Sequence, residues 1–197
     1  MPMPPLVLVH GLWDTPRLFR RLEQQLAGAR DPLLIPHLSH RLGATPLLSL
    51  AERLGEEIEQ RFGRQQPIDV LGFSMGGVIA RSWLQLLGGS QRTRRFLSVA
   101  SPQQGTLTAQ GCPRALIEGI ADMKVGSALL RRLNADHRAL DGVECLSYFT
   151  PTDQVVVPGW RAVLPFGPVR PLPVWLHQNV LSAPASLELL RQELLRP

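Results

Sequence analysis

Several features that mark particular classes of protein are scarce in this sequence. No apolar run among its 197 residues approaches the ~20 residues that a membrane-spanning helix needs. The two cysteines, Cys112 and Cys145, do not form a C-x-x-C pair, so neither zinc binding nor thioredoxin-like chemistry is indicated, and we expect two free thiols. The start of the chain lacks the basic segment and the long apolar run of a signal peptide, and we therefore expect a cytoplasmic protein.

Lysine is almost absent, because all but one of the 21 basic residues are arginines; the formal net charge is +5. Several arginines lie close together in two clusters along the chain. We interpret these clusters as parts of solvated helix and loop faces, and weak contact with an anionic membrane surface is the alternative. No basic stretch is interleaved with aromatic residues, so we expect no nucleic-acid partner. The sequence leaves the oligomeric state open. The clusters comprise Arg92, Arg94 and Arg95, and Arg131, Arg132 and Arg138.

The composition that is present fits one folded domain spanning residues 1–197. Hydrophobic residues make up 44% of the chain and charged residues 19%, as in ordinary globular proteins. Segments with strand and helix patterns alternate along the chain, which favours an α/β fold with a mostly parallel sheet of about six strands flanked by helices. Strands are expected at residues 6–9, 32–35, 68–73, 96–100, 143–149 and, as the last one, 161–164.

Helices are expected in the intervals between these strands. Thr15-Pro16 and Thr45-Pro46 each indicate a helix start, with proline at the first helical position. Residues 75–87 are apolar nearly all round, which predicts a buried helix. Residues 186–195 are expected to form the closing helix. Residues 105–140 interrupt the alternation with about two short helices, and this segment is longer than an ordinary connection.

The segment Gly72-Phe73-Ser74-Met75-Gly76 has the pattern G-x-S-x-G between a predicted strand and a predicted helix. This pattern is typical of a serine nucleophile that stands exposed on a sharp strand-to-helix turn. Glycine on both sides removes side chains that such a turn would crowd. The N-terminus of the following helix favours negative charge that develops beside the serine. Ser74 is therefore the predicted nucleophile, and a tight turn with an incidental serine is the alternative.

A second informative loop, Val9-His10-Gly11-Leu12-Trp13, follows the first predicted strand. Acyl transfer needs two backbone N–H donors for the oxyanion of the tetrahedral intermediate. We expect one from Met75, which follows the nucleophile, and the other from Leu12, since Gly11 lets the backbone approach the substrate. His10 lies at the end of the strand, and we expect it to support the loop rather than to act as a base.

A base and a carboxylate that orients it are expected after the serine, in the order serine, acid, histidine. Asp153 follows the predicted strand that ends near Phe149, and the carboxyl end of a strand is where α/β sheets hold functional groups. His177 lies in a late loop before the closing helix. The predicted catalytic residues are therefore Ser74, Asp153 and His177.

Other aspartates and histidines fit these roles less well. Asp141 precedes its predicted strand and Asp69 lies within one, so neither is expected at the carboxyl edge of the sheet. Structural or surface positions in helices and loops are expected for Asp122, Asp136, His37, His40 and His137.

With these motifs the sequence resembles the α/β-hydrolase superfamily, and within it the compact bacterial lipases and esterases. The resemblance implies that Ser74 is the nucleophile, His177 the general base and Asp153 its partner, with Leu12 and Met75 forming the oxyanion hole. It also implies that residues 105–140 form a small helical cap or lid. Related lipases often have histidine where Gln103 or Gln104 stands. The resemblance is carried by Val9–Leu12, Gly72–Gly77, Ala100–Thr106, Asp153 with Val157-Pro158, and His177.

Together these features predict an enzyme that cleaves a carboxylic ester of a small molecule or lipid through an acyl-enzyme, with no metal and no cofactor. Trp13, Leu116, Ile120 and Met123 are expected to line an apolar substrate slot, and ordinary helix packing is the alternative for the last three. An acyltransferase or a thioesterase would use the same three catalytic residues. A non-catalytic protein that binds a lipid or small ligand in the same place is a further alternative.

Overall fold

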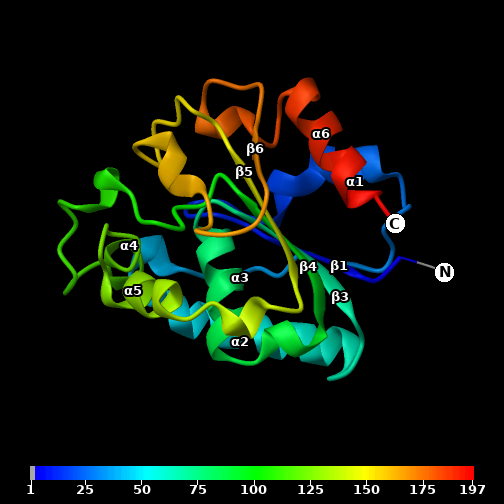
Figure 1. The fold of residues 1–197 in the computed structure, drawn as a ribbon, viewed down its shortest axis with the longest axis horizontal. Helices are drawn as coiled ribbons and strands as arrows, with labels where there is room; N and C mark the ends of the chain where they lie inside the picture. Colours follow the sequence, from blue (N-terminus) through cyan, green and yellow to red (C-terminus); the bar gives the residue numbers. More distant parts are fainter. Residues whose placement is uncertain (1–2) are drawn as a thin grey trace.

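The computed structural model describes residues 3–197, and its centre is a six-stranded sheet in the order β2-β1-β3-β4-β5-β6 (Figure 1). All neighbouring strands run parallel, so their carboxyl ends meet at the same edge. This sheet confirms the predicted α/β class. The strands are β1 (Leu6–Val9), β2 (Leu33–Leu34), β3 (Ile68–Phe73), β4 (Thr93–Val99), β5 (Glu144–Phe149) and β6 (Val169–Pro171).

Helices cover both faces of the sheet. One face carries α1 (Arg20–Leu26) and α6 (Pro184–Leu194), and the other carries α2 (Leu47–Phe62), α3 (Met75–Leu86) and α5 (Ala128–Ala135) (Figure 1). A separate apolar core fills the space on each side. Because β1 is buried on both faces, it requires the continuous apolar run that its sequence shows.

Short helices occupy many of the connections. They are η1 (Pro16–Phe19), η2 (Arg41–Gly43), η3 (Gly89–Arg92), η4 (Leu107–Ala109), α4 (Glu118–Ala121), η5 (Arg138–Leu140), η6 (Gly159–Ala162) and η7 (His177–Asn179).

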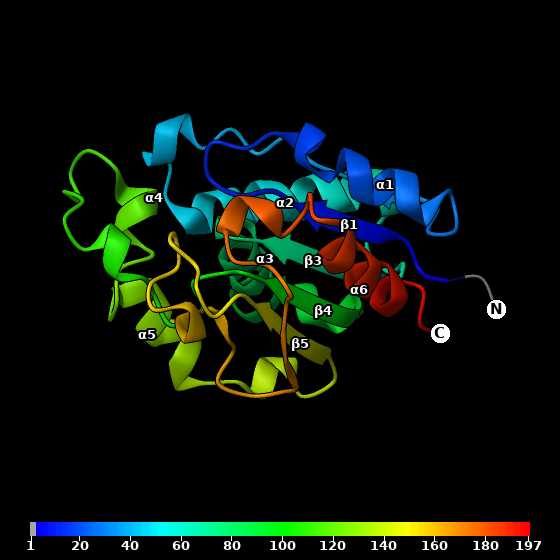
Figure 2. The ribbon, with the colours of Figure 1, turned by 90° about the horizontal axis from the view of Figure 1, so that it is seen from above.

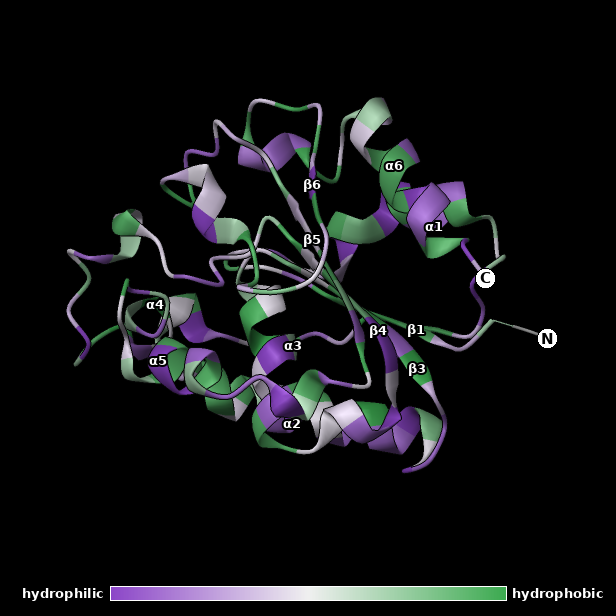
Figure 3. Cartoon of the chain, in the orientation of Figure 1, coloured by the Kyte–Doolittle hydropathy of each residue, from purple (hydrophilic) through white to green (hydrophobic). Residues whose placement is uncertain are grey.

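Helix α2 illustrates how the sequence pattern selects the buried face. Leu47, Leu50, Leu54 and Ile58 recur at helical spacing, and all four are fully buried. Figure 3 shows hydrophobic and hydrophilic residues alternating along this helix. Burial of each such side chain contributes about 1.5–3 kcal/mol, so this stripe anchors α2 against the sheet.

The final strand is not the predicted one. A strand was expected at residues 161–164, but the sixth strand is β6, at residues 169–171. Leu164 is buried and its N–H donates to Ser147 Oγ at 2.9 Å, so the apolar run packs beside the sheet without joining its ladder. The three residues of β6 are exposed and include Pro171, which is tolerated at a sheet edge. An apolar pattern therefore does not reveal this strand.

Residues 105–140 contain α4 and α5, in agreement with the two short helices expected there. Helix α5 packs against α3, with Leu130 and Leu133 in the core. The preceding part of the segment lies beyond the carboxyl ends of the strands, whereas the start of the described chain at residue 3 and the C-terminus lie at the opposite end (Figure 1 and Figure 2). That residues 105–140 act as a cap stays a prediction. Nowhere in residues 3–197 is there a helix both long enough and apolar enough to cross a bilayer.

A buried ion network lies near the start of β3. Asp69 accepts hydrogen bonds from Arg30 at 2.8 Å and from Arg94 at 3.0 and 2.8 Å. The Arg30 guanidinium also donates to Leu194 O at 2.7 Å and to Pro4 O at 3.0 Å. These bonds tie β3 to both ends of the chain, and they offset the cost of burying the charges.

Candidate active site

Ser74 occupies the turn between β3 and α3, as predicted. Its φ of +53° and ψ of −128° form a conformation that residues with side chains rarely adopt. The Ser74 N–H donates to Val99 O at 2.9 Å, and the Ser74 carbonyl accepts from the Gly77 N–H at 3.0 Å. The neighbouring backbone therefore holds this strained residue in place.

Glycines allow the turn to pack against the sheet. A Cβ atom at Gly72 would overlap the backbone of Gly77, and one at Gly76 would overlap the carbonyl oxygen of Val9. Any larger residue at either position would push α3 away from β1 and β3. The two glycines thus have the close-packing role that the G-x-S-x-G pattern predicts.

Asp153 and His177 come from two separate loops and meet at the same edge of the sheet. Asp153 Oδ2 lies 2.8 Å from His177 Nδ1. The other carboxylate oxygen accepts the N–H groups of Val155 at 2.8 Å and Val156 at 2.9 Å. A neutral His177 facing this carboxylate carries its proton on Nδ1, which leaves Nε2 as an acceptor. This is the tautomer that a general base requires.

The His177 ring lies against the residue before the nucleophile. The ring centroids of His177 and Phe73 are 4.9 Å apart. Ser74 Oγ donates no hydrogen bond to another side chain within residues 3–197. Contacts between nucleophile and base are often loose without substrate and tighten when it binds. The arrangement therefore brings the three predicted catalytic residues to one region of the sheet edge.

Asp14 is a polar group of this region that sequence reasoning missed. A Cβ atom built on Gly11 would lie 2.8 Å from Asp14 Oδ2 and 3.0 Å from Ser74 Cβ, so both side chains flank the same point. Burial raises the pKa of the Asp14 carboxyl, and the nearby His177 and His40 act in the opposite direction. The only sequence feature that could have indicated a role for Asp14 is its position directly after the loop that carries Leu12.

The two predicted oxyanion donors remain free to bind a ligand. The Met75 N–H is at the first position of α3, where a helix offers its N–H groups no acceptor. Within the described residues the Leu12 N–H also donates to no other group. Leu12 and Ser74 line the same cavity.

Two histidines hold the Leu12 loop. His10 supports it as predicted, since His10 Nε2 accepts the Leu38 N–H at 3.2 Å and Nδ1 lies 3.0 Å from Gly11 O. His40 lies in a loop, as one of the two expectations for it had it, but it is buried rather than on the surface, and its Nε2 accepts the Trp13 N–H at 3.0 Å. No local sequence pattern could reveal this contact, because His40 and Trp13 are 27 residues apart.

A cavity of 260 Å³ opens beside Ser74, and its walls are mainly apolar. Three of the predicted substrate residues, Trp13, Ile120 and Met123, line it. Leu116 does not, and its side chain is 72% exposed. Most other lining residues were not predicted, because they come from loops without a periodic pattern. These are Pro102, Thr106, Thr108, Ala109, Cys112, Gln154, Val155 and Val156.

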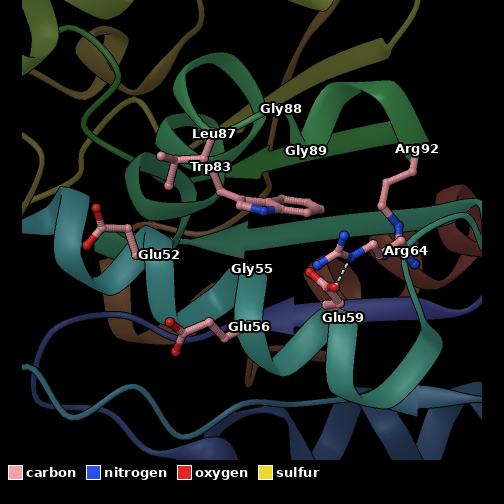
Figure 4. A pocket seen from close by; sticks show the side chains of 10 residues that line it. All are labelled: Glu52, Gly55, Glu56, Glu59, Arg64, Trp83, Leu87, Gly88, Gly89 and Arg92. Carbon is pink, nitrogen blue, oxygen red and sulfur yellow. Dashed lines mark hydrogen bonds and ion pairs between the residues drawn. The ribbon is translucent and has the colours of Figure 1, made fainter.

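A second hollow, between α2 and the end of α3, has a different character (Figure 4). Three glutamates of α2 line one side, and Glu59 pairs with Arg64. Its ten lining residues include no serine, cysteine or histidine, so this hollow offers no nucleophile–base pair. They are Glu52, Gly55, Glu56, Glu59, Arg64, Trp83, Leu87, Gly88, Gly89 and Arg92.

Residues 5–140 match the family described as palmitoyl protein thioesterase. The chain belongs to this family. The part that matches the palmitoyl protein thioesterase model contains Leu12 and Ser74, whereas Asp153 and His177 lie beyond it. No curated protein sequence matches the chain.

Solved structures that resemble this member of the palmitoyl protein thioesterase family include two lipases and a thioesterase. Bacillus licheniformis lipase BlEst2 in its mature form has a TM-score of 0.73 at 15% identity, covering 98% of this chain and 92% of that one. Aspergillus fumigatus lipase B has a TM-score of 0.76 at 16% identity, covering 98% of this chain and 52% of that one.

The thioesterase is RedJ, from the prodiginine biosynthetic pathway of Streptomyces coelicolor. It has a TM-score of 0.63 at 19% identity, covering 98% of this chain and 89% of that one. At these identities the likeness establishes the fold, and it confirms the predicted α/β-hydrolase fold. The chain is therefore a hydrolase-type protein of the group that contains lipases, esterases and thioesterases.

Proposed function

We propose that this protein is a serine hydrolase that cleaves a carboxylic ester with an apolar acyl group. The observation that carries the proposal is the contact between Asp153 and His177 in the same region as Ser74. Ser74 itself lies on a strained turn and lines an apolar cavity. A pair of this kind orients an imidazole to take a proton from a nearby hydroxyl. The cavity next to the hydroxyl then receives the acyl chain.

The reaction proceeds in two halves. His177 Nε2 takes the proton of Ser74 Oγ, which attacks the ester carbonyl, and the N–H groups of Leu12 and Met75 stabilise the oxyanion. Collapse of this intermediate breaks the bond to the alkoxy oxygen, which leaves as an alcohol with the proton from His177. Water then gives a proton to His177 and attacks the acyl-enzyme. The carboxylic acid departs and the proton returns to Ser74.

The cavity dimensions suggest a medium-length acyl group. The cavity volume of 260 Å³ leaves room for an acyl chain of several methylene groups. We expect activity on p-nitrophenyl esters to be greatest near an eight-carbon acyl chain. Highest activity on the acetate ester would contradict an apolar acyl site.

Thioester cleavage is a second candidate, and the match of residues 5–140 to the palmitoyl protein thioesterase family favours it. The same acyl-enzyme would form, and a thiol would leave in place of an alcohol. Octanoyl esters of p-nitrophenol and of a simple thiol, assayed side by side, separate the two candidates. A much larger kcat/KM for the thiol ester would favour the thioesterase.

The decisive experiment is labelling with a fluorophosphonate probe followed by mass spectrometry. We expect stoichiometric labelling of Ser74 in the folded protein, and loss of labelling in His177→Ala. Ser74→Ala should keep its fold and lose its esterase activity by several orders of magnitude, because nucleophile and base act as a unit. Absence of labelling in folded protein would favour the non-catalytic binding protein instead.

A further inference from the structure

The loop that carries Leu12 is held at a second point by a side chain distant in sequence. The Trp13 N–H donates to His40 Nε2 at 3.0 Å. Trp13 has a φ of +61°, in the left-handed region that residues with side chains avoid. Its indole is 70% exposed and contributes little packing that would hold this conformation. The backbone hydrogen bond to His40 is therefore the contact that restrains the loop at this position.

The His40 main chain is itself held in a fixed place. The His40 carbonyl accepts the N–H groups of Gly43 at 2.9 Å and of Thr45 at 3.2 Å, which closes a turn around η2. The His40 and His10 rings lie 6.4 Å apart, edge to face. A Cβ atom on Gly43 would lie 3.3 Å from Leu12 Cδ1, so η2 also packs against the residue that the loop must position.

We propose that His40 is a positioning residue for the oxyanion hole, holding the main chain at Trp13 so that the Leu12 N–H faces the reacting carbonyl. The inference rests on the proposed function, in which the Leu12 N–H stabilises the oxyanion. Oxyanion donors stabilise the transition state because they already point at the position of the oxyanion before the reaction begins. A shift of the loop by a fraction of an ångström would therefore remove much of this stabilisation.

The acceptor role requires a neutral imidazole. A protonated His40 would turn an N–H group toward the Trp13 N–H, and the hydrogen bond would be lost. The titratable groups that face His40 are His10 and Asp14 from the loop after β1 and His37 from its own segment. Burial lowers the pKa of His40, and the nearby histidines act in the same direction while Asp14 opposes them. The contact therefore persists through neutral pH and fails as the solution becomes acidic.

The test compares substitutions that keep or remove the acceptor. His40→Leu has no acceptor, whereas His40→Gln carries a carbonyl oxygen that reaches about as far as Nε2 and does not titrate. We expect His40→Leu to lower kcat on an octanoyl ester by about tenfold or more, with KM within about twofold. His40→Gln should restore most of kcat. The control is His37→Leu, which removes an exposed imidazole that stacks on His10 and should leave kcat unchanged.

Two further readouts distinguish positioning from a general loss of structure. Hydrogen exchange of the Trp13 amide should be faster in His40→Leu than in the native protein, while amides of β3 keep their protection. The acidic side of the kcat/KM profile should be steeper in the native protein than in His40→Gln, because protonation of His40 adds to the loss of activity only in the native protein.

A folded His40→Leu with native kcat would overturn the inference. If His40→Leu fails to fold, identical acidic slopes in His40→Gln and the native protein, together with identical Trp13 amide exchange in the two proteins at acidic pH, would overturn it. Ser74→Ala is assayed in parallel. Retained activity in Ser74→Ala refutes the proposed function itself, whereas lost activity there with native kcat in His40→Leu refutes only the role of His40.

Discussion

Asp153 faces His177 with one carboxylate oxygen and two backbone N–H groups with the other. The carboxylate is therefore fixed before any substrate arrives, and it determines which nitrogen of His177 carries the proton. Substitution Asp153→Asn would present an amide N–H to Nδ1 and favour the opposite tautomer. We expect kcat to fall by about 10³–10⁴-fold with an unchanged fold. Steady-state kinetics on an octanoyl ester measure this effect.

Asp141→Asn is the matched control for this substitution. Asp141 is exposed and lies just before β5, at the opposite end of that strand from Asp153. It should leave kcat within about twofold of the native value. A similar kcat in both variants would contradict the orienting role of Asp153.

Strain at Ser74 predicts a difference in stability between two inactive variants. Ser74→Ala keeps a Cβ atom at a φ of +53°, whereas Ser74→Gly removes it. We expect Ser74→Gly to be the more stable of the two by about 1 kcal/mol, because relief of strain outweighs the greater chain entropy of glycine. Urea unfolding midpoints measure the difference. Equal midpoints would show that the turn is not strained in solution.

Acyl selectivity should respond to residues inside the cavity and not to the exposed Leu116. Met123→Trp fills part of the space beside Ser74, so the preferred acyl chain should shorten by a few carbons. Leu116→Trp makes the same kind of change outside the cavity lining and should leave the preference unaltered. The measurement is kcat/KM across p-nitrophenyl esters of increasing chain length. An unchanged optimum in Met123→Trp would mean that the acyl chain binds elsewhere.

The two cysteines should differ in their response to alkylation. Cys112 lines the cavity, whereas Cys145 is buried in the core and burial raises the pKa of its thiol to about 12. We expect N-ethylmaleimide to modify Cys112 alone in the native protein and to inhibit the proposed esterase activity by blocking the cavity. Peptide mapping locates the label, and Cys112→Ser should remain active in the presence of the reagent. Inhibition that persists in Cys112→Ser would point to another target.

The network around Asp69 predicts that a substitution of this residue destabilises the fold strongly and leaves the catalytic activity of the folded protein unchanged. Asp69→Asn leaves the Arg30 guanidinium, which is 1% exposed, without its charge partner. Breaking a buried pair in this way costs about 3–5 kcal/mol. Urea unfolding of Asp69→Asn measures the change. As a control, Asp136→Asn breaks an exposed pair with Arg138, where solvent screening leaves little to lose, so its unfolding midpoint should hardly move.

Much of the sheet and of the proposed catalytic set could be predicted from sequence because local patterns encode them. An apolar run such as Leu6–Val9 predicts a buried strand directly. The glycines around Ser74 record the close approach of α3 to β1. Asp153 and His177 follow from chain order and from their places after a strand and before the last helix. Each of these features depends on a few consecutive residues, so it can be recognised in the sequence without knowledge of distant contacts.

The features that escaped prediction depend on contacts between distant segments. Residues 161–164 are apolar enough for a strand, but the Leu164 N–H donates to the Ser147 side chain and not to a neighbouring strand. The strand that pairs with β5 is β6 instead. His40 carries no sign of its bond to Trp13 in its own neighbourhood. Leu116 has the spacing of an inward residue, yet it lies on a loop that leaves it exposed.

The tight backbone contacts of Gly72 and Gly76 have a consequence for how this protein can diversify. At Gly72 and Gly76 the turn has no space for a side chain, so a larger residue at either position should disrupt folding and chemistry together. Residues 106–123 supply much of the cavity wall, and of these only Ala109, Ala121 and Met123 belong to the buried apolar core. A mutagenesis library confined to exposed and half-buried positions of that segment should therefore yield new acyl preferences with few unfolded members. Tolerance to change and control of selectivity reside in the same stretch of chain.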